Sequence, residues 1–222
     1  MDWQALSVSI RLGVGTLVVL LPVGLAAGHV LATRRFRGRA IAEALVAVPL
    51  LLPPTVLGYY LLTSFGARSP FGAAFEHLVG HTLAFSFPGL LVASVIANIP
   101  FVVQPIQRGF EAIPPGVREA AACCGLTPWR RFLRIDLPLA WPAVVTAAVL
   151  AFAHTLGEFG VVLMVGGNIP AETRTMSIAI YDRMQAFDDR AAGLMAAVLL
   201  TVAVAALATT TALSRRIGQR HG

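Results

Sequence analysis

Five apolar stretches, each about 20 residues long, divide this chain and constrain its fold more than any other feature. A hydrocarbon layer about 30 Å thick is crossed by about 20 helical residues. Lipid offers no hydrogen-bond partner to backbone N–H and C=O groups, so runs of this length must satisfy those groups within helices. The sequence therefore predicts an all-α, polytopic transmembrane helical bundle. We expect about five spanning helices, at residues 12–33, 41–65, 83–103, 139–157 and 193–213.

The composition agrees with a bilayer as the solvent of these segments. Of the 222 residues, 57% are hydrophobic and 13% are charged, which is too apolar for one soluble core. The stretches between the apolar segments leave no room for a second, soluble domain. We therefore expect a single transmembrane domain over residues 1–222.

All 17 basic residues are arginine, and the chain has no lysine. A P-loop needs a lysine on the nucleotide phosphates, and a Schiff-base enzyme needs an amine. We therefore expect a chain that is not an enzyme, without an ATPase motif, catalytic residues or a cofactor of its own. The net charge of +6 does not indicate nucleic acid as a partner, because the arginines punctuate apolar runs and do not lie on a soluble fold with base-stacking aromatics.

The placement of arginine predicts the orientation, because cytoplasmic loops retain positive charge. Twelve of the 17 arginines follow the first, third or last predicted span, and with five spans these three segments lie on one side of the membrane. The N-terminus is then outside, and the C-terminus is cytoplasmic. The twelve arginines that indicate this orientation are Arg34, Arg35, Arg37, Arg39, Arg108, Arg118, Arg130, Arg131, Arg134, Arg215, Arg216 and Arg220.

A polar stretch, residues 114–138, interrupts the apolar segments on the predicted cytoplasmic side. Pro114–Pro115 can open a helix, because proline fits the first turn. Gly125 can end this helix in the left-handed conformation. Thr127–Pro128 can then cap and begin a second short helix over residues 129–134. The sequence therefore predicts a helix, a sharp turn and another helix that lie across the membrane surface.

The first of these helices carries a stripe of small apolar side chains at three- and four-residue spacing. Small residues permit close approach to the groove of another protein, and Glu119 beside them could pair with a basic group there. The alternative for Glu119 is a solvated charge favoured by the helix dipole. Cys123 and Cys124 are adjacent, which disfavours a disulfide or a metal site, so we interpret them as small apolar fillers. The stripe consists of Val117, Ala120, Ala121 and Cys124.

The spacing in this stretch is specific: EAA, three residues, Gly, nine residues, Ile, one residue, then Leu-Pro. It resembles the EAA signature of permease subunits of bacterial ABC importers, which implies the type I permease core of that class. In that family a short cytoplasmic helix docks into a cleft of the ATPase subunit. The resemblance carries this coupling role to Glu119, Ala120, Ala121, Gly125, Ile135, Leu137 and Pro138.

The family resemblance extends over essentially the whole chain and narrows the substrate. It includes residues 48–62 of the second predicted span. The stretch after the fourth span, with the GEFG element at 157–160 followed by residues 167–175, resembles the molybdate permeases more closely than their sulfate and tungstate relatives, which share a GE(F/Y)G element. The resemblance implies molybdate import across the bacterial inner membrane, driven by ATP hydrolysis on a separate subunit that binds ATP and Mg. It further implies a homodimer and an extracytoplasmic binding protein. Sulfate or tungstate transport remains the alternative.

A transient path for an oxyanion needs neutral hydrogen-bond donors that hold it weakly. Thr55, Tyr59, Asn98 and His154 are candidates for the path, although such groups are also common as helix–helix hydrogen bonds. A carboxylate would repel an oxyanion, so we expect Glu158 to be a gate or an interhelical contact. The short apolar run 159–165 cannot span, and we place it outside or re-entrant.

Two other classes of membrane protein remain to be weighed. An intramembrane enzyme would need a catalytic arrangement within the spans, and His154 with Ser94 is the nearest approach to one. An ion-coupled secondary transporter would show charged relay residues or inverted repeats, and neither is visible. Gly24 and Gly28 form a GxxxG pair that could pack closely on another helix or arise by chance.

Overall fold

The computed structural model describes residues 1–218, with side chains through residue 208. Arg220 and the side chains of Arg215 and Arg216, part of the basis for the predicted orientation, lie outside this description. Within it, the chain is helical and has no β-strand. The elements are α1 (Trp3–Thr33), α2 (Arg39–Leu51), α3 (Pro54–Phe65), α4 (Pro70–Val79), α5 (Phe87–Glu111), α6 (Pro115–Cys123), α7 (Pro128–Arg131), a π-helical segment (Phe132–Asp136), α8 (Leu137–Gly157), α9 (Gly160–Gly166), α10 (Met176–Gln185) and α11 (Asp189–Gly218).

The described residues contain four helices long and apolar enough to cross a membrane, or five if one bent pair is a single span. The four are α1, α5, the continuous helix Pro128–Gly157 and Asp189–Ala208 of α11. This confirms the predicted all-α membrane bundle. The helices begin at caps outside the apolar runs: the Asp2 carboxylate accepts from Ala5 N–H at 2.9 Å before α1, which satisfies a donor of the first turn.

The span predicted over residues 41–65 is not one continuous helix but a bent pair that passes as a single candidate span. It consists of α2 and α3, which meet at an angle of 106°. The residue before a proline is disfavoured in the helical conformation, so Leu52 and Pro53, each followed by proline, stop α2. Pro54 then fits the first turn of the next helix, and α3 starts in a new direction.

The central helix is α5. Of its 18-residue apolar stretch, 56% is buried inside the protein. One apolar cluster packs it against α1 and α8 through residues such as Leu20, Ile106 and Ala147. A second cluster packs it against α3 and α9 through Leu61, Ala93 and other side chains. The GxxxG pair of α1 faces α5 of the same chain, where a Cβ on Gly28 would lie 2.8 Å from Ile106 Cγ2.

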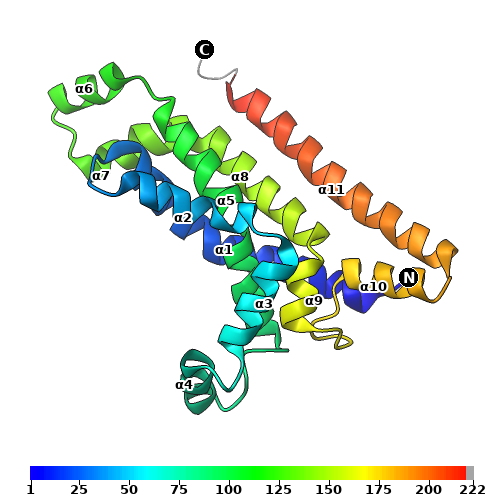
Figure 1. The fold of residues 1–222 in the computed structure, drawn as a ribbon. Helices are drawn as coiled ribbons and strands as arrows, with labels where there is room; N and C mark the ends of the chain where they lie inside the picture. Colours follow the sequence, from blue (N-terminus) through cyan, green and yellow to red (C-terminus); the bar gives the residue numbers. More distant parts are fainter. Residues whose placement is uncertain (219–222) are drawn as a thin grey trace.

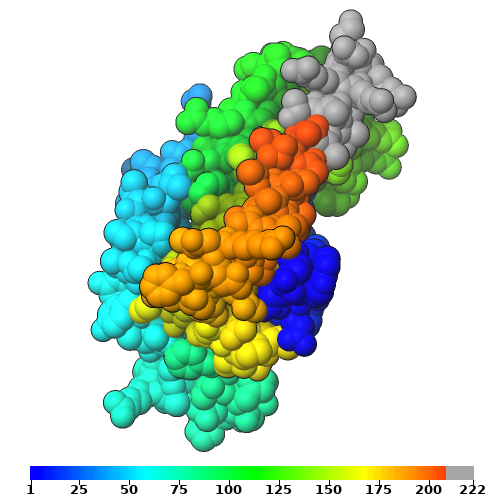
Figure 2. All heavy atoms as spheres, turned by 90° about the vertical axis from the view of Figure 1, so that its right-hand side faces the viewer, coloured from blue at the N-terminus to red at the C-terminus, as the bar shows by residue number. Residues whose placement is uncertain are grey.

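The two ends of the bundle differ (Figure 1). One end carries α6 and α7, and the N-terminus lies near α10 at the other end. Arg39 of α2 donates to Glu111 of α5 at 2.7 Å, which places the arginine-rich loop after α1 at the end of α5 that leads to α6. Figure 2 shows α11 running along an outer face, and only 11% of its 18-residue apolar stretch is buried.

The short run 159–165 is largely the helix α9, and it is part of the packed bundle. Val161, Val162 and Val165 are buried, and α9 contacts α3 and α5. The helix is too short to span, but it is not a free outer loop, because its apolar face completes the second apolar cluster. It lies at the end of the bundle opposite α6 (Figure 1).

Candidate functional site

The segment between α5 and α8 is built by local hydrogen bonds that the sequence encodes. Gly125 has φ of 73°, and its N–H donates to Ala122 C=O while Leu126 N–H donates to Ala121 C=O. This pair of bonds closes the end of α6 in the Schellman arrangement. The hydroxyl of Thr127 accepts from Arg130 N–H at 3.4 Å and caps α7. The predicted helix, glycine turn and capped second helix are therefore present.

The signature residues of α6 do not all face the same way. Glu119 and Ala120 are exposed, whereas Ala121 is 4% exposed. Ala121 therefore packs inside the segment and offers no surface to another protein. Cys123 and Cys124 are free and exposed, so as small apolar side chains they lie on the surface of this chain and fill no position in its core.

The second short helix is not separate, contrary to prediction. α7 passes through the π-helical segment into α8, and together they form one helix of 30 residues, Pro128–Gly157. Ile135 lies in the π-helical segment, while Leu137 and Pro138 begin α8. Pro138 has no N–H to donate, but it directly follows the π-helical segment and the helix continues through it. Movement of α7 therefore passes directly into the transmembrane part of α8.

Sequence analysis missed Asp136, a fully buried carboxylate at the junction of these elements. Arg118 of α6 donates from Nε to its Oδ1 at 3.0 Å. Arg131 Nε of α7 lies 3.4 Å from its Oδ2, and His29 Nε2 of α1 lies 3.8 Å from the same oxygen. We call Asp136, Arg118, Arg131 and His29 the Asp136 junction. The available signal was a lone carboxylate in an arginine-rich stretch at the start of a span, where an ionisable group is functional by default.

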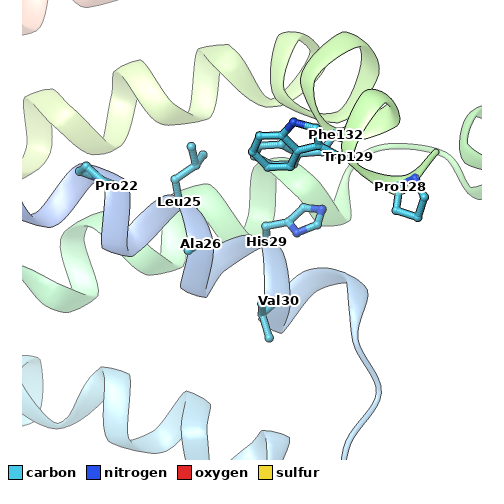
Figure 3. Close-up of a pocket in the computed structure, with 8 residues that line it drawn as sticks. All are labelled: Pro22, Leu25, Ala26, His29, Val30, Pro128, Trp129 and Phe132. Atoms are coloured by element: carbon cyan, nitrogen blue, oxygen red, sulfur yellow. The ribbon is translucent and has the colours of Figure 1, made fainter. Parts of the chain in front are cut away.

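An apolar groove of about 530 Å³ lies beside the Asp136 junction, between α1 and α7. Figure 3 shows the His29 ring extending from α1 towards the stacked rings of Trp129 and Phe132. The ring centroids of His29 and Phe132 are 4.8 Å apart. The other lining residues are Pro22, Leu25, Ala26, Val30 and Pro128.

The candidate path residues Asn98, His154 and Glu158 come together inside the bundle. Asn98 Nδ2 of α5 donates to the hydroxyl of Thr155 on α8 at 3.0 Å. His154 Nδ1 lies 3.2 Å from Asn98 Oδ1, and His154 Nε2 lies 3.5 Å from Glu158 Oε2. Glu158 Oε1 accepts from Val161 N–H of α9 at 3.0 Å. A buried polar network thus joins α5, α8 and α9.

This network also reaches α1, because the hydroxyls of Thr16 and Ser94 are 2.8 Å apart and Asn98 Nδ2 donates to Ser94 C=O. A cavity of about 110 Å³ borders His154, Glu158 and Phe101 and extends to α2 and α3. The network therefore stands between the packed core and the break between α2 and α3. The network can hold α5, α8 and α9 in fixed positions relative to one another, and its side chains can close the narrow cavity beside them.

Thr55 and Tyr59 do not join this network. Both lie on α3 and are exposed in the single chain, and Tyr59 packs edge-on against Tyr60 with ring centroids 5.8 Å apart. Both residues therefore lie on a surface that another molecule could cover. The structure thus divides the five candidate path residues into an internal group of three and an exposed pair.

A polar cavity of about 410 Å³ opens between α2 and α5, at the end of the bundle that carries α6. Gln107 Nε2 donates to Glu43 at 2.8 Å and to Glu111 at 3.0 Å, while Arg39 binds both carboxylates. The cavity therefore presents charges of both signs. Among the residues that the structure describes, no group of three or more His, Cys, Asp or Glu side chains is placed to hold a metal ion.

Comparison with known proteins agrees with this architecture. Residues 21–219 match the family model described as "Binding-protein-dependent transport system inner membrane component". The molybdenum transport system permease protein ModB of Azotobacter vinelandii is 48% identical over 187 residues, covering 84% of this chain and 83% of the relative. ModB of Escherichia coli K12 is 36% identical over 184 residues, covering 83% and 80%. The sulfate transport system permease protein CysT of Escherichia coli K12 is 36% identical over 200 residues, covering 89% and 71%.

Solved structures share the fold at low sequence identity. A chain of a bacterial alginate ABC transporter, crystallised with an alginate pentasaccharide-bound periplasmic protein, has a TM-score of 0.79 at 17% identity, covering 97% of this chain and 78% of that one. A chain of the inward-facing MetNI methionine ABC transporter has a TM-score of 0.70 at 19% identity, covering 97% and 94%.

Proposed function

This chain belongs to the family of binding-protein-dependent transport system inner membrane components, and on that premise we propose that it is the membrane-spanning subunit of an ABC importer for molybdate. The observation that carries this proposal is the 48% identity to a molybdenum transport permease over 84% of the chain. Glu158 belongs to the GEFG element, and its carboxylate is part of the buried network. Sulfate is the second candidate, because a sulfate permease is 36% identical over 89% of the chain.

The residues 114–138 are the proposed contact with an ATP-binding subunit. The exposed part of α6, with Glu119 and Ala120, would enter a cleft of that subunit, and Gly125 would set the turn. Ile135, Leu137 and Pro138 would carry the movement into α8, because the helix from Pro128 to Gly157 is continuous. ATP and Mg would bind to the partner, and this chain would contribute no catalytic residue.

Two copies of this chain are proposed to enclose the path. A single copy leaves Thr55 and Tyr59 of α3 exposed, and a second copy facing them would turn this surface into the wall of a channel. The neutral hydroxyls there would bind a dianion weakly enough to release it. Asn98, His154 and Glu158 would act behind that wall, holding the break between α2 and α3 in position as part of a gate.

The proposed orientation puts the α6–α7 end in the cytoplasm and the N-terminus outside. Support comes from the arginines at that end, including Arg39 and those of residues 114–138, because cytoplasmic loops retain positive charge. The opposite end, with α9 and α10, would then receive the oxyanion from an extracytoplasmic binding protein. The single domain would thus connect the two partners across the inner membrane.

Reconstitution tests this function directly. The chain is co-expressed with its ATP-binding subunit, placed in liposomes, and supplied with ATP inside and the loaded binding protein outside. We expect ATP-dependent accumulation of molybdate. Equal or faster accumulation of sulfate would replace the substrate assignment by the second candidate, and tungstate is measured in parallel. Accumulation by the purified chain alone, without ATP or a partner, would contradict the ABC importer assignment.

A further inference from the structure

Four elements converge on the carboxylate of Asp136, which is itself fully buried. Arg118 comes from α6, Arg131 from α7 and His29 from α1, while Asp136 ends the π-helical segment from which α8 continues. Arg118 also donates from Nη2 to Phe110 C=O at the end of α5, at 2.8 Å. The Asp136 junction therefore connects the exposed segment that we assign to ATPase docking with three long helices of the bundle.

Helix α6 has little else to hold it in place. It has nine residues, of which Ala121 is the buried one, and a helix this short is not stable without tertiary contacts. An ion pair with a carboxylate removed from water is not screened as a surface pair is. The contact of Arg118 with Asp136 is therefore the main polar link between α6 and the bundle.

The two oxygens of Asp136 have different environments. Oδ1 accepts the hydrogen bond from Arg118, whereas Oδ2, Arg131 Nε and His29 Nε2 are buried without a hydrogen-bond partner. Buried polar atoms without partners raise the free energy of the state that contains them. The unpartnered atoms face one another at 3.4 and 3.8 Å. Arg131 and Asp136 belong to one continuous helix, so a small displacement of this helix relative to α1 would complete the contact with His29.

The surroundings permit such a displacement. The apolar groove of about 530 Å³ separates α7 from α1 on the side of His29, so α7 is not packed tightly there (Figure 3). The segment that ends at Asp136 is π-helical, a form that often marks functional sites within α-helices. Within the junction, Asp136 is hydrogen-bonded to Arg118, a contact that we call the fixed arm. It lies near Arg131 and His29 without a hydrogen bond, and we call these two contacts the open arms.

We propose that Asp136 is the positioning residue that transmits ATP-driven movement of α6 and α7 to α1, α5 and α8. The fixed arm makes α6 move with the start of α8. The open arm to His29 closes or separates as the helix that begins with α7 moves across the groove relative to α1, so the junction has two arrangements. This inference deepens the proposed function and depends on it, because it presumes an ATPase subunit that moves α6.

The test uses the full complex with ATP-binding subunit and binding protein in liposomes. Asp136→Asn keeps the size of the side chain and removes its charge. We expect it to co-purify with the ATPase and hydrolyse ATP, but to transport about tenfold less oxyanion per ATP hydrolysed. Asp136→Glu should restore part of that ratio. The matched control is Asp189→Asn, an exposed carboxylate at the start of α11, which should leave the ratio unchanged.

Asp136→Asn can fail to fold, so a milder variant is made in parallel. Arg118→Lys keeps the charge but cannot bond Asp136 and Phe110 C=O with one planar fork, and it should lower the same ratio. A wild-type ratio in folded Asp136→Asn or in Arg118→Lys overturns the proposal. Loss of ATPase binding by folded Asp136→Asn also overturns it, because Asp136 would then act in docking and not in transmission.

A distance measurement separates this inference from the transport assignment. Spin labels are attached to Val30→Cys and Trp129→Cys, on opposite sides of the groove, after Cys123→Ser and Cys124→Ser replacements. In the wild-type junction the separation of the labels should shift when ATP binds to the complex, and Asp136→Asn should abolish the shift. An unchanged separation in the wild type, or an equal shift in the variant, overturns the inference. A wild-type complex that shows the shift but accumulates no oxyanion contradicts the transport function alone.

Discussion

Glu158 accepts a hydrogen bond from the backbone N–H of Val161 at 3.0 Å. This contact satisfies a first-turn donor of α9, which has no side-chain cap at its own N-cap residue. The other carboxylate oxygen lies 3.5 Å from His154 Nε2 on α8. One side chain thus holds the sharp connection between α8 and α9, and a short helix that cannot span the membrane keeps a defined position against α3 and α5.

Replacing Glu158 separates its role as an acceptor from its charge. Glu158→Ala leaves the buried N–H of Val161 without a partner, which costs about 1–3 kcal/mol of the free energy of unfolding. Glu158→Gln retains an acceptor oxygen and should lose less than half of that. Thermal unfolding of the detergent-solubilised protein measures both. Equal losses would show that the charge towards His154 is the stabilising property.

The amide of Asn98 is the centre of the buried network, with partners on α5 and α8. Asn98→Ala should destabilise the protein by about 1–3 kcal/mol, because Thr155 and His154 each lose a partner in a buried site. Thr146→Val is the matched control, since that exposed hydroxyl bonds only within its own helix. The midpoint of thermal unfolding should fall for Asn98→Ala and stay near the wild type for the control. A similar fall in both would contradict the importance of the network.

The positive φ of Gly125 makes a direct prediction about the turn after α6. Gly125→Ala meets no atom within 4 Å, but an L-residue in the left-handed conformation costs about 1–2 kcal/mol. The Schellman end of α6 should loosen, and the yield of co-purified ATPase subunit should decrease. Gly193→Ala in α11 also meets no atom and lies outside residues 114–138, so it should bind normally. Normal binding by Gly125→Ala would show that the turn is not required for docking.

The close approach of α1 to α5 at Gly28 predicts another difference. A Cβ there would lie 2.8 Å from Ile106 Cγ2 and 3.0 Å from the backbone N of Gln107. Gly28→Ala should therefore lower the free energy of unfolding by about 1–3 kcal/mol through overpacking. Gly193→Ala, with nothing within 4 Å, should be neutral or raise it by up to about 1 kcal/mol. Denaturation in detergent compares the two, and a stable Gly28→Ala would mean that the helices separate at little cost.

The exposed thiols of Cys123 and Cys124 report the orientation. A membrane-impermeant maleimide should label them in inverted vesicles and leave them unlabelled in intact cells. Bound ATPase subunit should slow the labelling, because α6 would then be covered. The variant Cys123→Ser/Cys124→Ser is the control for labelling elsewhere. Rapid labelling in intact cells would place this segment outside and contradict both the orientation and its role as an ATPase contact.

Local features of the structure followed from the sequence wherever one residue type forces one conformation. Gly125 ends α6, Thr127 caps α7 and the apolar runs form helices. At residues 41–65 paired prolines bend the apolar run into α2 and α3. Hydropathy registers how apolar a segment is but not its direction, and the turn chemistry of Leu52–Pro54 was the information that decided it.

The sequence by itself determined that this is a bundle of membrane-spanning helices with an arginine-rich, proline- and glycine-punctuated segment on one side. That information lies in hydropathy and in short-range stereochemistry. Tertiary structure alone decided that Asp136 meets Arg118, Arg131 and His29, that Ala121 is covered, and that Asn98 and His154 meet while Tyr59 faces outwards. Those contacts depend on how each helix is rotated about its axis, and the rotation is set by close packing between helices far apart in the chain.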